Sequence, residues 1–259
     1  MLTLSFRHWA SAALLAGGLL GSLPTLADQP PPEAASGFAR ITAPTAFDHA
    51  MIVTANPLAS DAGAAILRQG GSAVDALIAA QWVLGLTEPQ SSGLGGGGFL
   101  LTHDGKRTLQ SWDGRETAPA AARGERFIGA DGKPLPFTQA VASGKAVGVP
   151  GLVAMLYAAH QQHGKLPWAA LAQPAIQLAE QGFAVSPRLY TLLVQETRLQ
   201  ADANARRYFF SEDGRPRPVG SLLRNPDYAD TLRRIARRGP AGFYQGPVAA
   251  DMVRAVQNH

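Results

Sequence analysis

The chain has 259 residues, a formal net charge of +4 and no cysteine. The lack of cysteine excludes a thiol nucleophile, thiolate metal ligands and the class of small exported domains held together by disulfides. The positive balance comes from arginines between Arg206 and Arg238. No aromatic residue interleaves in the run TLRRIARRG at residues 231–239, so we interpret these arginines as a solvated helix face and not as a nucleic-acid surface.

The first residues have the pattern of a secretory signal. Arg7 and His8 give a short cationic start, residues 10–20 form an apolar run too short to span a bilayer, and Ala27 ends a cleavage-site pattern. We expect a signal peptide over residues 1–27, a Pro-rich flexible lead-in over residues 28–40 and a periplasmic or secreted location. An N-terminal membrane anchor is the alternative, and no later run is long enough to span a membrane.

The first ordered elements are predicted from residue 49 onward. The apolar stretch HAMIVTAN at residues 49–56 predicts a strand. Asn56 followed by Pro57 predicts the N-cap and first position of a helix that ends at Gly70 and Gly71.

A second helix and a hairpin are predicted next. Residues 72–75 (SAVD) form a capping box for a helix that runs to about Thr87 and is apolar nearly all round, so we expect it to be buried. After the glycines, FLLTH at residues 99–103 and RTLQSWD at residues 107–113 predict two strands joined at Asp104-Gly105.

From Pro150 onward the spacing of apolar residues is helical. Helices are predicted over residues 151–162, 168–181, 187–200, 226–238 and 247–259.

The glycine run between the buried helix and the hairpin fits a dinucleotide motif only formally. Gly93, Gly95 and Gly98 satisfy G-x-G-x-x-G, but that motif requires a strand before it and a helix after it. Here the order is reversed, so a phosphate-binding role is rejected. Two interpretations stay open: a close-packed turn, or a turn beside a reaction centre.

Arg115 is the candidate binding residue. It follows the second strand, and its planar guanidinium fits a carboxylate with two parallel hydrogen bonds. Asp113 and Glu116 could instead form a salt bridge with it, and residue type alone favours that salt bridge. His160 and His163 share a helix without a third ligand, so we expect surface residues, no metal site and no cofactor.

Four segments resemble the N-terminal part of the γ-glutamyltransferases (glutathione hydrolases). They are residues 51–101, DGRETAPAAA at 113–122, ASGKAVGVPGLVAML at 142–156 and GPAGFYQGPVAADMV at 239–253, within a likeness that extends from about Phe38 to the end. The resemblance implies an α+β fold, the four-layer αββα sandwich of N-terminal nucleophile hydrolases, and a precursor that cleaves itself into two subunits. It also implies glutathione as substrate, and a small-subunit N-terminal threonine as nucleophile with its own α-amino group as base.

In that family the arginine of the motif matched by RETAP at residues 115–119 binds the α-carboxylate of the γ-glutamyl group. The resemblance therefore favours Arg115 as a substrate clamp. The chain ends before the family's processing site, so residues 41–259 are expected to be a partial large-subunit domain without the nucleophile. The alternatives are a glutaryl or cephalosporin acylase of the same fold, or a non-catalytic truncated remnant.

Overall fold

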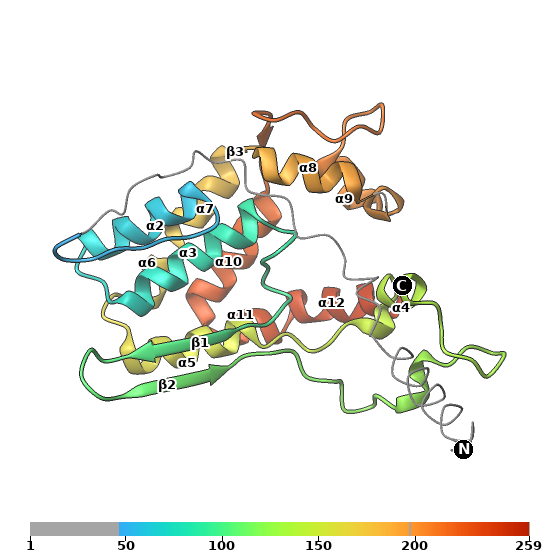
Figure 1. Cartoon of the computed structure of the whole chain (residues 1–259), viewed down its shortest axis with the longest axis horizontal. Helices are drawn as coiled ribbons and strands as arrows, with labels where there is room; N and C mark the ends of the chain where they lie inside the picture. Colours follow the sequence, from blue (N-terminus) through green and yellow to red (C-terminus); the bar gives the residue numbers. More distant parts are fainter. Residues whose placement is uncertain (1–46, 197, 259) are drawn as a thin grey trace, which may run out of the picture. The chain divides into compact units, whose positions relative to one another are not determined.

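The computed structural model describes residues 47–196 and 198–258. The expected signal peptide over residues 1–27 and the lead-in over residues 28–40 lie outside these residues. The described part combines helices and strands and is mostly helical, in agreement with the α+β prediction (Figure 1). Within it, no helix is long and apolar enough to cross a membrane.

The α-helices are α2 (Pro57–Arg68), α3 (Ala73–Thr87), α4 (Phe137–Val141), α5 (Leu152–His163), α6 (Trp168–Leu171), α7 (Gln173–Gln181), α8 (Pro187–Gln195), α9 (Ala203–Phe209), α10 (Pro226–Arg238), α11 (Ala241–Tyr244) and α12 (Pro247–Gln257). The 3-10 helices are η1 (Gly124–Phe127), η2 (Gly144–Ala146) and η3 (Arg198–Ala201). The strands are β1 (Phe99–His103), β2 (Leu109–Asp113), β3 (Phe183–Ala184) and β4 (Leu222–Leu223).

The predicted starts of α2 and α3 are confirmed at the level of individual hydrogen bonds. The Asn56 side chain accepts from the backbone N–H of Leu58 at 3.1 Å. Ser72 Oγ accepts from the N–H of Asp75 at 3.1 Å, and the Asp75 carboxylate accepts from the N–H of Ser72 at 2.8 Å, which completes the capping box. Each cap satisfies donors that a helix start otherwise leaves unpaired.

Helix α3 is the centre of the hydrophobic core. Helices α2, α5, α6 and α7 all pack against it. Ile78, Trp82 and Val83 are fully buried, and the Trp82 ring meets the Trp168 ring edge to face at 5.8 Å. The prediction of a helix that is buried on nearly all sides is therefore confirmed, and only partners on several faces can satisfy such a helix.

The predicted hairpin is also confirmed. Strands β1 and β2 pair in antiparallel fashion, from Phe99 opposite Asp113 to His103 opposite Leu109, and β2 contacts α5 (Figure 1). In the turn, the Asp104 carboxylate accepts three backbone N–H groups. The bonds from Lys106 and from residues 107 and 108 hold the pKa of Asp104 at about 2, because they stabilise its ionised form.

One face of this hairpin exposes three large apolar side chains. Leu100 is buried, whereas Phe99, Leu101 and Leu109 are 70, 66 and 66 % exposed. Apolar side chains in this pattern on one face of a sheet are typical of a surface that another layer covers.

The predicted strand at residues 49–56 is wrong for this structure. Residues 50–54 form no strand, and Met51 and Val53 are 62 and 78 % exposed. An apolar stretch becomes a strand only when its backbone groups pair with a neighbour, and no neighbouring strand pairs with it among residues 47–196 and 198–258.

Two predicted helices differ in extent. The helix predicted over residues 168–181 is divided into α6 and α7 around Ala172, because Pro174 lacks an N–H donor and fits only the first turn of a helix. The helix predicted over residues 187–200 ends at Gln195, and Glu196 leaves the helical conformation with φ −96° and ψ 83°.

Helix α10 carries the predicted arginine face. Arg234, Arg237 and Arg238 are exposed, whereas Arg233 pairs with Glu180 of α7 and with Asp230. On the opposite side of the helix, Leu232 and Ile235 are among its buried residues. The pattern is that of an amphipathic surface helix.

Candidate functional site

The glycine run between α3 and β1 packs backbone against backbone. A Cβ atom added at Gly97 would lie 2.5 Å from the carbonyl oxygen of Gly114 and 2.8 Å from the Cα of Arg115. A Cβ added at Gly151 would lie 2.4 Å from the same Gly114 oxygen and 2.6 Å from the Arg115 oxygen. The main chain at Gly114 and Arg115 is thus enclosed from two sides by residues without side chains.

Steric room, and not an unusual backbone conformation, explains this use of glycine. None of the glycines between residues 93 and 98 has a positive φ. A Cβ added at Gly93 or Gly95 would meet no atom within 4 Å. Glycine is therefore required for close approach at Gly97, while its neighbours Gly93 and Gly95 have space for a methyl group.

Backbone hydrogen bonds join the three segments that meet here. Gly98 and Gly114 exchange bonds of 3.1 and 3.0 Å, and Gly96 O accepts from the N–H groups of Gly151 and Leu152 at 3.2 Å each. Thr117 and Val149 form a further antiparallel bridge. Residues 96–98, 114–117 and 149–152 therefore form one main-chain network, which we call the glycine brace.

Arg115 projects from the glycine brace. Its N–H donates to Asp113 Oδ1 at 2.9 Å, which fixes the backbone, and its side chain is 57 % exposed. Arg115 Nη2 lies 3.2 Å from Glu116 Oε2, so one of the two salt bridges considered from the sequence is present. The guanidinium carbon also lies 6.0 Å from the centre of the Phe99 ring.

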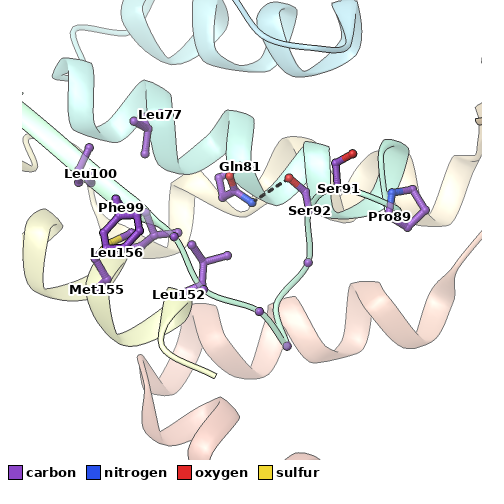
Figure 2. Close-up of a pocket in the computed structure, with 15 residues that line it drawn as sticks. Leu77, Gln81, Pro89, Ser91, Ser92, Phe99, Leu100, Leu152, Met155 and Leu156 are labelled. Atoms are coloured by element: carbon purple, nitrogen blue, oxygen red, sulfur yellow. Dashed lines mark hydrogen bonds between the residues drawn. The ribbon is translucent and has the colours of Figure 1, made fainter. Parts of the chain in front are cut away.

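A pocket of about 520 Å³ lies beside the glycine run. Figure 2 shows Gln81 of α3 directed at Ser92, whose Oγ accepts from Gln81 Nε2 at 3.5 Å. The apolar part of the wall comes from α3, β1, α5 and the loop after α3, and includes Leu77, Pro89, Phe99, Leu100, Leu152, Met155 and Leu156 (Figure 2). Arg115 is not part of the wall, but it contacts the pocket residue Phe99.

A buried ion pair holds the loop that leads into the glycine run. Glu88, 1 % exposed, accepts from Arg188 Nη1 at 2.5 Å, from Asn56 Nδ2 at 2.8 Å and from Gln90 Nε2 at 2.6 Å. Arg188 Nη2 also donates to Ser91 Oγ at 3.0 Å. This cluster was not predicted from the sequence, although a carboxylate at the C-terminus of an apolar helix opposes the helix dipole and requires a partner.

The prediction that His160 is a surface residue is wrong. Its side chain is 10 % exposed, and Nε2 lies 2.9 Å from the carbonyl oxygen of Leu166 and 3.6 Å from Asp75 Oδ1. His163 is also partly buried and bonds Gln110 Oε1 at 2.7 Å. Both histidines thus join α5 to neighbouring segments. No group of three or more metal-binding side chains occurs among the residues that the structure describes.

Comparisons with known proteins agree on one family. A family model described as Gamma-glutamyltranspeptidase matches residues 59–259. The glutathione hydrolase proenzyme of Bacillus subtilis (strain 168) is 38% identical over 209 residues, which are 80% of this chain and 35% of that protein. The chain therefore spans about a third of the length of this curated relative.

Solved structures give the same result. The γ-glutamyltranspeptidase of Helicobacter pylori matches with a TM-score of 0.79 and 32% identity, over 83% of this chain and 62% of that one. A cephalosporin acylase from Bacillus halodurans matches with a TM-score of 0.67 and 32% identity, over 78% and 38% of the two chains. The chain belongs to the gamma-glutamyltranspeptidase family.

Proposed function

We propose that residues 41–259 are the large-subunit portion of a γ-glutamyltransferase or glutathione hydrolase, and that they act with a small subunit from the same precursor. Family membership supports the reaction class. The chain spans 35% of the length of the Bacillus subtilis proenzyme. The activity therefore requires this chain together with a segment that corresponds to the rest of that proenzyme.

The uncovered surfaces of the hairpin support such a partner. Phe99, Leu101 and Leu109 expose apolar side chains on one face, and the segment at residues 50–54 belongs to no strand and exposes Met51 and Val53. Strands from a small subunit would cover that face and complete the four-layer αββα sandwich.

The observation that carries the proposal is the bracing of Arg115. A substrate clamp must hold its guanidinium in a fixed place, and the glycine brace fixes the Arg115 main chain from two sides. The side chain stays accessible, and its pair with Glu116 is a partly exposed one. Such pairs contribute about 0–1 kcal/mol, so an incoming substrate carboxylate can replace Glu116 or share the guanidinium with it.

The division of chemistry follows from these roles. Arg115 binds and orients the α-carboxylate of the γ-glutamyl group through a planar, bidentate contact. The nucleophile is the N-terminal threonine of the small subunit, whose own α-amino group acts as base. No group of the large-subunit portion then has to accept a proton from the nucleophile. The signal-like pattern of residues 1–27 supports a periplasmic or secreted location.

The second candidate is a glutaryl or cephalosporin acylase. The similarity to the Bacillus halodurans cephalosporin acylase favours it. A glutaryl side chain has a carboxylate for Arg115 but lacks the α-amino group of a γ-glutamyl substrate. Arg115 therefore fits both candidates, and the substrates themselves must separate them.

The test is complementation. The 259-residue chain is co-expressed with the part of the Bacillus subtilis proenzyme that follows its matched third, and cleavage of γ-glutamyl-p-nitroanilide and glutaryl-p-nitroanilide is measured. The Bacillus subtilis enzyme divided at the same place is the matched control for assembly.

We expect the γ-glutamyl substrate to be cleaved and the glutaryl substrate to be cleaved far more slowly. The reverse preference would favour the acylase. If the two parts co-purify and the divided control is active, but neither substrate is cleaved, the chain is a non-catalytic remnant.

A further inference from the structure

A separate pocket of about 750 Å³ lies away from the glycine brace. It is formed by the last turn of α3, by α9, by β4 and by the first turn of α10. Three of its lining residues are arginines: Arg207, Arg217 and Arg224. They belong to the arginine-rich part of the sequence, but they are not on the solvated face of α10.

All three arginines are held by neutral groups. Arg217 donates from Nε to the Tyr208 carbonyl oxygen at 3.0 Å and from Nη2 to the Arg207 carbonyl oxygen at 3.1 Å. Arg224 Nε donates to the Gln181 carbonyl oxygen at 3.0 Å. Arg207 Nη2 donates to Asn204 Oδ1 at 3.0 Å.

Within residues 47–196 and 198–258, none of these three arginines forms an ion pair with a carboxylate, although Arg207 and Arg217 also line a second hollow that contains Glu212 and Asp213. The ion pairs of the described chain involve other arginines, among them Arg188, Arg198 and Arg233. One acidic residue, Asp227, lines the same pocket, so its lining residues carry three positive charges and one negative charge. The N-terminus of α10 adds a partial positive charge at this point, which also favours an anion.

The rest of the wall is apolar or neutral. Leu86, Leu222, Leu223 and Phe209 line the pocket, and the Phe209 ring meets the Tyr208 ring edge to face at 4.6 Å. A tyrosine hydroxyl is neutral at physiological pH, and burial moves the pKa of Tyr208 further from that pH, to about 12, so this group adds no negative charge. A pocket with a cationic part and an apolar part suits a ligand that has both an anionic and an apolar group.

We propose that this pocket binds a small organic carboxylate, with the anionic group on its arginines and the apolar group against Leu86 and Phe209. A guanidinium held by carbonyl groups keeps its full charge and is oriented before the ligand arrives, which lowers the cost of binding. The site differs from the Arg115 site in every charged residue. It does not depend on the proposed function, because the 259-residue chain contains all of its residues.

The experiment is a ¹⁹F NMR titration of the 259-residue chain with 4-(trifluoromethyl)benzoate. The matched neutral probe is 4-(trifluoromethyl)benzyl alcohol, which has the same apolar body without the charge. The variants are Arg207→Gln and Arg224→Gln. The control variant is Arg215→Gln, since Arg215 lies between them in the sequence, is paired with Asp213 and does not line the pocket.

We expect saturable binding of the benzoate and at least fivefold weaker binding of the alcohol. Each pocket variant should weaken benzoate binding by roughly threefold or more, as expected for the loss of one charged contact of about 0.7 kcal/mol, while Arg215→Gln stays within about twofold. Added salt should weaken benzoate binding and leave the alcohol unaffected.

The proposal is overturned by no saturable binding, by equal binding of the two probes, or by unchanged benzoate binding in the Arg207→Gln variant. Arg207 is exposed, and the bond that its side chain makes to Asn204 is local, so this variant should fold. If Arg224→Gln does not fold, Arg224→Lys keeps the charge. If a folded Arg224→Lys variant binds the benzoate no more tightly than it binds the alcohol, a charge-based site is also contradicted.

Discussion

Gly97→Ala tests the glycine brace directly. The new Cβ would start 2.5 Å from Gly114 O and 2.8 Å from the Cα of Arg115. Ordinary contacts between carbon and oxygen begin at about 3.3 Å, so the two segments must separate by nearly 1 Å. Because both atoms belong to the main chain, no side chain can rotate away to make room.

The size of the effect follows from two opposing terms. Overpacking at a well-packed position costs about 1–3 kcal/mol, and replacing glycine by alanine returns about 0.4–1 kcal/mol through the unfolded state. The net loss of about 1.5 kcal/mol corresponds to a fall in Tm of roughly 3–6 °C for a domain of this size.

The assay is thermal unfolding of the chain, followed by circular dichroism, with Gly95→Ala as the matched control. Gly95 lies in the same run and has no atom within 4 Å of its added Cβ, so its variant should keep the Tm within about 1 °C of the original chain or raise it slightly. A Tm for Gly97→Ala equal to that of Gly95→Ala would refute the close packing of these segments.

Three further predictions concern buried and turn residues. Arg188→Ala leaves the Glu88 carboxylate without its cation, so it should lower the free energy of unfolding by about 3 kcal/mol, measured by urea denaturation. Arg234→Ala, at an exposed arginine, is the control. A loss for Arg188→Ala no larger than that of the control would contradict a buried pair. Tyr228→Phe removes the 2.7 Å bond to the Trp82 carbonyl oxygen and should cost about 1 kcal/mol in the same assay, while an unchanged midpoint would show that the bond is absent. The pKa of Asp104, measured by NMR, should be about 2, below its ordinary value of 3.8. Its contribution to stability is therefore present above pH 3.8 and is lost as the pH falls through about 2. A measured pKa near 3.8 would contradict the hydrogen bonds of the turn.

Local chemistry explains what could be predicted from the sequence. The caps at Asn56 and Ser72, the apolar composition of α3 and the Asp104-Gly105 turn each depend on residues within a few positions of one another. Such signals are readable because the hydrogen bonds involved are local.

The missed features depend on distant partners. The Glu88–Arg188 pair joins residues 100 positions apart, and the burial of His160 depends on its approach to Asp75. The segment at residues 50–54 has the composition of a strand but pairs with no strand in the described chain. The sequence left the glycine run open between a close-packed turn and a turn beside a reaction centre, and the close packing at Gly97 is evident only from the position of residues 114 and 115.

The central claim is that the glycine brace holds Arg115 as a carboxylate clamp. The most direct measurement is the kinetics of γ-glutamyl-p-nitroanilide cleavage by the complemented enzyme, with Arg115→Ala compared with Arg107→Ala. Arg107 is an exposed arginine in the turn of the same hairpin and serves as the control for charge.

Loss of a clamp worth about 2–5 kcal/mol should lower kcat/KM by roughly 30-fold or more, mainly through a higher KM, while Arg107→Ala stays close to the original enzyme. Unchanged kinetics for Arg115→Ala, in an assembled and otherwise active complex, would contradict the claim.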